Sequence, residues 1–343
     1  MGAIDAFHVK QVIWETLHTA HFHRFADIYS ASLRGEALVE ETVPMAEIPD
    51  FVRSGDAAVA REVRVARMSE TFYVAPLMSR LVTAAAESWP EDEPVLAEDW
   101  PTTHGFMYIP GGVSTVDVRG QVNVTEIFTW EVRGSQTEVV WWTNKKYDAP
   151  VMRERIGWSE IPQYTPWHIV VLKHGRALPQ AMVMGTVIPP EVGREMRWIT
   201  GPNGERSLYF PQGWTPEQLH PHIGVDRVSA WLVSALRIMQ QPLAAVERKG
   251  MPANLRKSLM RHPVRLKQKA VTVIDFRRRV GDFEHVGERE YSHRFLRRGH
   301  WRRQQYKRDD GEWDRRRIWI HSTIVGDPSK PLILREHVNA LTR

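Results

Sequence analysis

The sequence contains no cysteine among its 343 residues. This absence excludes disulfide bonds, thiolate metal ligands and cysteine nucleophiles. The start of the sequence shows no basic segment followed by an apolar core, and no uninterrupted apolar run approaches the roughly 18 residues that a membrane-spanning helix needs. We therefore expect a cytoplasmic protein that has neither a signal peptide nor a contact with a membrane.

Glycine-rich phosphate-binding loops of the Walker or dinucleotide type are also missing, so we expect no nucleotide and no other cofactor. The histidines that come nearest to metal-ligand spacing are His18 and His21, which lie one helical turn apart. No further cluster of ligands accompanies them, and the sequence therefore predicts no metal site.

Charge is distributed unevenly along the chain. The formal net charge is only +5, but residues 248–317 hold 22 Lys and Arg against 9 Asp and Glu, whereas the remaining residues hold 24 against 32. Such a split concentrates positive potential on one module, which favours a polyanionic partner for that module. A solvated basic surface without a partner is the alternative interpretation.

Hydrophobic residues make up 42% of the chain, enough for sizeable cores and about two domains. Apolar spacing predicts helices over 5–33, 69–88 and 221–241, and strands within 105–210 and over 271–276, 291–298 and 317–323. The stretch 69–88 contains Pro76, so two separate pieces are an alternative there. The expected fold is α+β, with a helical N-terminal segment, a β-rich middle and a basic C-terminal antiparallel strand module packed on the amphipathic helix 221–241. The expected domains are 1–220 and 221–343.

The most informative segment is 291–306, where arginines, aromatic residues and histidines are interleaved. Arginines neutralise phosphates, aromatic rings stack on bases and glutamines contact base edges, so this pattern predicts a nucleic-acid interface for DNA or RNA. The predicted contact residues are Arg294, Arg298, His300, Trp301, Arg302, Arg303, Gln304, Tyr306 and Arg316.

A structural interpretation of the same segment stays open. Trp301 and Trp319 can belong to a core, and the arginines can be solvated or paired with acidic residues of the segment 307–314. Gly299 permits a bend or bulge that changes the direction of the two side chains that follow it.

The stretch from Arg298 to Gln304 reads RGHWRRQ, and it is followed by Arg317-Ile-Trp-Ile320, Gly326 and Pro331-Leu332. This arrangement resembles a group of actinobacterial phage and mobile-element proteins that carry an RGHWR stretch followed by a WI strand. Weaker likeness extends upstream through 231–241 and 100–130. The resemblance implies a common origin and fold but no activity, because that group has no assigned function. His321 departs from the pattern, which has a small residue or proline there.

Two other functions are compatible with the sequence. Histidine, tyrosine and arginine suffice for RNA cleavage without metal, so a toxin-like ribonuclease with His293 or His300 as catalytic base and Arg298 and Arg302 as charge stabilisers is one alternative. The other is a phage-encoded factor that binds a host protein.

Overall fold

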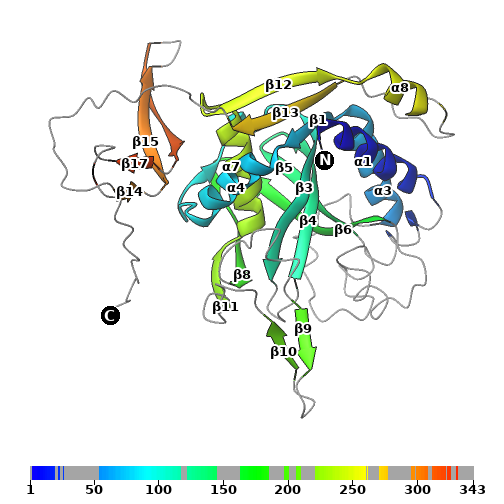
Figure 1. The fold of residues 1–343 in the computed structure, drawn as a ribbon, viewed down its shortest axis with the longest axis horizontal. Coiled ribbons are helices and arrows are strands. Elements are labelled where there is room, and N and C mark those ends of the chain that lie inside the picture. The colour runs from blue at the N-terminus through cyan, green and yellow to red at the C-terminus, as the bar shows by residue number, and fades with distance from the viewer. Residues whose placement is uncertain are drawn as a thin grey trace.

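A computed structural model describes residues 2–19, 22–23, 26, 54–116, 122–144, 163–184, 197–200, 206–209, 221–259, 261, 270–276, 295–297, 299–307, 311–321, 323–325 and 330. The fold is α+β, as the sequence predicts. Its centre is a seven-stranded mixed sheet with helices on both faces (Figure 1).

The sheet has the strand order β12-β13-β1-β3-β4-β5-β6. Its strands are β1 (Glu70–Val74), β3 (His104–Val116), β4 (Val122–Arg133), β5 (Gln136–Asn144), β6 (Tyr164–Lys173), β12 (Ala244–Gly250) and β13 (Ala270–Phe276). β1 pairs in parallel with β3 and β13, whereas the other pairs are antiparallel. Strands from both sides of residue 220, the predicted domain boundary, therefore share one sheet.

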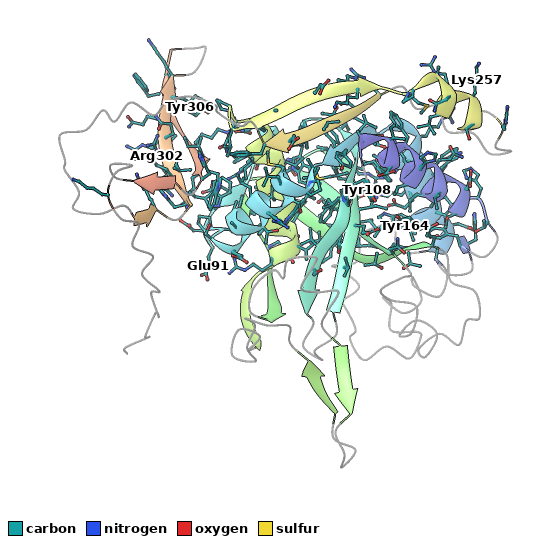
Figure 2. All side chains as sticks on the ribbon, viewed as in Figure 1. Glu91, Tyr108, Tyr164, Lys257, Arg302 and Tyr306 are labelled. Carbon is teal, nitrogen blue, oxygen red and sulfur yellow. The ribbon has the colours of Figure 1, made fainter. Side chains whose placement is uncertain are left out.

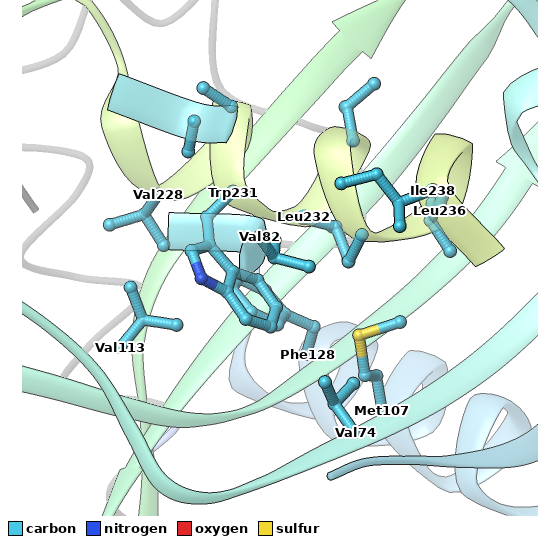
Figure 3. Close-up of a cluster of buried hydrophobic side chains, with 14 of the residues drawn as sticks. Val74, Val82, Met107, Val113, Phe128, Val228, Trp231, Leu232, Leu236 and Ile238 are labelled. Carbon is cyan, nitrogen blue, oxygen red and sulfur yellow. The ribbon is translucent and has the colours of Figure 1, made fainter. Parts of the chain in front are cut away.

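Helices α4 (Pro76–Glu87) and α7 (Arg227–Met239) cover one face of the sheet. In α7 the Asp226 side chain caps the N-terminus by accepting from the Val228 N–H, and apolar residues at helical spacing point at the strands. Figure 3 shows Trp231 and Leu232 of α7 directed towards Phe128 and Met107 of the sheet. Phe128 and Trp231 stack with ring centroids 6.0 Å apart.

Helices α1 (Ala3–Thr16) and α3 (Gly55–Met68) cover the opposite face. The alternation of side chains along a strand divides the two cores: Phe72 packs with α4 and α7, and its neighbour Tyr73 packs with α1 and α3. Ser54 caps α3 by accepting from the Ala57 N–H. None of the helices in the described ranges is long and apolar enough to cross a lipid bilayer.

The remaining elements are short. They are β2 (Pro94–Val95) paired with β7 (Arg176–Ala177), β8 (Gln180–Met184) with β11 (Pro221–Val225), β9 (Arg197–Thr200) with β10 (Arg206–Tyr209), β14 (Phe295–Arg297) with β17 (Thr323–Val325), β15 (His300–Lys307) with β16 (Trp313–Ile320), the 3-10 helix η3 (Ala97–Asp99), and α8 (Ala253–Leu259). The β15–β16 hairpin stands at one end of the molecule beside α4 and α7, and α8 lies at the other end (Figure 1).

Three predicted helices differ from the structure. Residues 70–74 of the predicted helix 69–88 form strand β1, because this apolar segment pairs with β13 on one side and β3 on the other. Pro76 then begins α4. Residues 221–225 of the predicted helix 221–241 form β11, and the helix begins only after its cap at Asp226. Residues 17–19 interrupt the predicted helix 5–33, where Thr19 Oγ1 donates to the Thr16 carbonyl.

Candidate nucleic-acid interface

The β15–β16 hairpin carries most of the predicted contact residues. Its strands pair antiparallel from His300↔Ile320 to Lys307↔Trp313, and Gly311 in the connecting segment has a positive φ of 87°. Because side chains alternate along a strand, the register divides the hairpin into two faces. We call one the anchored face: Trp301, Arg303, Gln305, Lys307, Trp313, Arg315, Arg317 and Trp319. We call the other the outer face: His300, Arg302, Gln304, Tyr306, Asp314, Arg316, Ile318 and Ile320.

Tryptophans fix the anchored face to the body of the protein. Trp301 packs edge-on against Trp319 and against Trp89, with ring centroids 5.5 Å and 5.3 Å apart, and its indole N–H donates to the Ala85 carbonyl over 3.0 Å. Trp319 is 4% exposed and belongs to the core that includes α4 and α7. A Cβ at Gly299 would lie 2.4 Å from the Trp319 ring, so that position requires the close approach only glycine allows.

Ion pairs fix the same face beside the tryptophans. Arg317 Nε lies 2.7 Å from Glu93 Oε2, and the other oxygen of Glu93 accepts from Arg237 of α7 over 2.6 Å. Asp92, on the surface, lies 3.5 Å from Arg317 and 3.9 Å from Arg303. These two arginines therefore lie beside acids that precede β2 in the chain. Asp309 and Asp310 of the hairpin loop, which the structural interpretation names, lie outside the described residues.

On the outer face Arg302 and Tyr306 are exposed, whereas His300, Gln304, Arg316, Ile318 and Ile320 are half-buried. Arg302 is exposed, and its Nη2 donates to Gln304 Oε1 over 2.5 Å on the same face. Tyr306 is 38% exposed. Arg316 is half-buried, because its guanidinium donates to Gln240 Oε1 at the end of α7 over 2.5 Å. Figure 2 labels Arg302 and Tyr306 on β15, at the end of the molecule opposite Lys257.

The tip of the hairpin holds a residue that the sequence analysis leaves out. Trp313 is 70% exposed, the most exposed large apolar side chain in the described part of the chain. It lies across from Lys307 and shares a face with Arg315, and both of these cations are exposed. The sequence pattern places Trp313 in the polar loop 307–314. A tryptophan in such a loop, where it has no core to pack in, is the signal that could have identified it as a candidate contact residue.

The structure separates the predicted contact residues. It brings His300, Arg302, Gln304, Tyr306 and Arg316 onto one face, and it puts Trp301 and Arg303 on the other. His293, Arg294 and Arg298 lie outside the described residues. His321 packs edge-on against Phe276 with ring centroids 5.9 Å apart. Trp301 thus contacts the protein itself, and its predicted stacking on bases gains no support.

A second polar cluster lies between α3 and the sheet. Arg61 and Glu62 form a buried ion pair, and Glu131 accepts from Arg64 over 2.9 and 2.8 Å and from Arg133 over 2.9 Å. Burial alone would raise the pKa of Glu131, but the hydrogen bonds from Arg64 and Arg133 outweigh it and lower that pKa to about 2. This cluster joins α3 to the sheet, which is a structural role. Within the described residues, no three His, Asp or Glu side chains are grouped as a metal site.

Comparisons with known proteins assign no family. No protein-family model matches the sequence, and no curated protein matches it either. Among solved structures, the crystal structure of AcrVA2 is similar over 94% of this chain and 96% of that chain, with a TM-score of 0.35 and 13% identity. At this level the similarity carries no conclusion about function.

Proposed function

We propose that this protein binds nucleic acid through the β15–β16 hairpin. The observation that supports the proposal most is that Arg302 and Tyr306 are exposed on the side of β15 opposite Trp301, which packs against the body. A rigidly held strand that presents arginine, amide and tyrosine side chains offers contacts for phosphates and for bases.

The charge of the hairpin supports the same proposal. Its two strands contain six Lys and Arg, three on each strand, and one acidic residue, Asp314. Arg303 and Arg317 lie beside carboxylates, and Arg316 contacts α7. Arg302, Lys307 and Arg315 are exposed and are the cations that we expect to contact the nucleic acid. An origin in a phage or mobile element and a cytoplasmic location remain predictions from the sequence.

The test is a binding titration of the full chain against labelled DNA and RNA over a series of salt concentrations, with and without chelator. A triple variant, Arg302→Ala, Lys307→Ala and Arg315→Ala, is compared with a control that removes three exposed cations elsewhere, Arg67→Ala, Arg248→Ala and Lys257→Ala. Both variants lose the same charge, so only the position of the charge differs.

We expect the hairpin variant to lose most of its affinity and the control to retain it, with a log–log salt slope that falls by about 0.7–0.9 per lost phosphate contact. Equal losses in both variants would show that the hairpin is not the site. If no nucleic acid binds even at low salt, the proposal is wrong and binding to a host protein becomes the better hypothesis. Chelator-resistant cleavage of the RNA would instead favour the ribonuclease.

A further inference from the structure

We infer that the partner is double-stranded DNA in the B form, and that the outer face of the β15–β16 hairpin enters its major groove. The inference rests on the proposed function and names the class of nucleic acid that fits the hairpin.

The shape of the hairpin favours a duplex groove. β15 and β16 pair through eight consecutive positions without a bulge, which gives a ribbon about 27 Å long at roughly 3.4 Å per residue. The major groove of B-form DNA is about 12 Å wide and admits a two-stranded ribbon. The major groove of an RNA duplex is too deep and narrow for side chains to read, so the same ribbon does not fit there.

Arg302 and Gln304 of the outer face are of the residue types that read base edges in that groove. Arginine forms paired hydrogen bonds with O6 and N7 of guanine, and glutamine forms them with N6 and N7 of adenine. Arg302 and Gln304 lie two residues apart on one face of β15 and are hydrogen-bonded to each other. Gln304 Nε2 also donates to the Gln305 carbonyl over 3.2 Å, so on binding both side chains exchange these contacts for base edges.

The positions of the aromatic residues argue against a single strand. A surface that binds single strands stacks successive bases on aromatic rings exposed along one groove. Trp301 and Trp319 pack against the body. The exposed rings, Tyr306 and Trp313, lie on opposite faces of the ribbon, so they form no common stacking surface. Lys307 and Arg315, exposed near the tip of the hairpin, are the cations that we expect to reach the phosphates that border the groove.

The first test compares three competitors of equal length at one salt concentration: duplex DNA, one of its single strands and duplex RNA. We expect duplex DNA to bind about tenfold or more tightly than either of the others, a difference of at least about 1.4 kcal/mol. Equal or tighter binding of the single strand or of the RNA duplex would overturn this inference and leave the proposed function standing. Failure of all three to bind at low salt would overturn the proposed function as well.

The second test identifies the groove by dimethyl sulfate footprinting on the duplex. This reagent methylates N7 of guanine in the major groove and N3 of adenine in the minor groove. We expect protection of guanine N7 that the double variant Arg302→Ala and Gln304→Ala loses, while Arg67→Ala retains it; a thermal melt confirms that each variant is folded. Protection of adenine N3 in place of guanine N7 would show that the hairpin occupies the other groove.

Discussion

Arg317 of the hairpin and Glu93 of the body lie 2.7 Å apart, between Nε and Oε2, and the same carboxylate accepts a hydrogen bond from Arg237 of α7. One buried acid therefore neutralises a cation on each side of the junction between hairpin and body. Arg237 also packs over the ring of Trp89, which in turn contacts Trp301. Charge and packing thus hold the hairpin at the same place.

Removing the charge of Glu93 should weaken this junction. Glu93→Gln leaves Arg237 with Asp99 and Arg317 with the exposed Asp92, so we expect a loss of about 1–3 kcal/mol, less than for a buried charge left without any partner. Urea unfolding measures the loss. Asp92→Asn is the control, because Asp92 is exposed and an exposed pair contributes about 0–1 kcal/mol. Equal effects of the two substitutions would contradict the role that we assign to Glu93.

Two tryptophans of the hairpin, Trp301 and Trp313, should contribute very differently to the stability of the protein. Trp301→Ala removes the packing on Trp89 and Trp319 and the hydrogen bond to Ala85, so we expect a loss of about 3 kcal/mol in the free energy of unfolding. Trp313→Ala removes an exposed ring, and we expect a change within about 0.5 kcal/mol. Thermal melts of both variants distinguish these outcomes. If Trp301→Ala keeps the stability of the wild type and loses only its binding of nucleic acid, Trp301 is a base-stacking residue after all.

The single substitution Arg302→Ala should reduce affinity for nucleic acid and lower the salt slope by about one unit if Arg302 contacts one phosphate. If it reads a base instead, the substitution should cost about 1–3 kcal/mol on the preferred sequence and little on others. Titrations on two unrelated sequences separate these cases. Unchanged binding on both, with wild-type stability, would remove Arg302 from the interface.

Lys10 predicts a pH dependence of stability. Burial lowers its pKa from 10.5 to about 7, although Nζ donates to Ser69 O and to Thr71 Oγ1. Below pH 7 the lysine is charged in both the folded and the unfolded chain, so burying the charge carries its full cost. Between about pH 7 and 10.5 only the unfolded chain holds the proton, so stability should rise by up to about 1.4 kcal/mol per pH unit.

Unfolding of Lys10→Met and of the wild type across this range isolates the effect, because other titrating groups contribute equally to both. As the pH rises from 7 to 10.5, the free energy of unfolding of the wild type should increase relative to that of Lys10→Met. A constant difference between the two proteins would contradict the lowered pKa of Lys10.

Local patterns predict some of the fold well. The apolar spacing of α7 and the β-branched run of β13 identify both elements, because each has a clear periodicity and a clear stop. Apolar spacing does not distinguish strand β1 from a helix, because the apolar residues of β1 and α4 follow one another with only Pro76 to divide them. Strand β12 resembles a linker, since the charged residues of an edge strand look like those of a solvated segment.

The sequence predicts the contact residues of the β15–β16 hairpin only in part, because it does not show which face of the hairpin packs on the body. Alternation along β15 could separate Arg302 from Arg303, but neither face of the strand is purely apolar, so the sequence does not say which one packs. Trp89, Asp92 and Glu93, which lie far earlier in the chain, determine which face of β15 packs against the body. No local pattern contains such a contact.

The pairing of β1 with β13 has a consequence for synthesis of the protein. Phe72 pairs with Thr272, so the edge of β1 stays open until the ribosome has added about 200 further residues, which takes roughly 10–40 s at about 5–20 residues per second. Strand β12 cannot close that edge, because it joins the sheet only through β13. During this interval the nascent chain exposes an unpaired apolar strand, to which a chaperone or a non-native strand can bind.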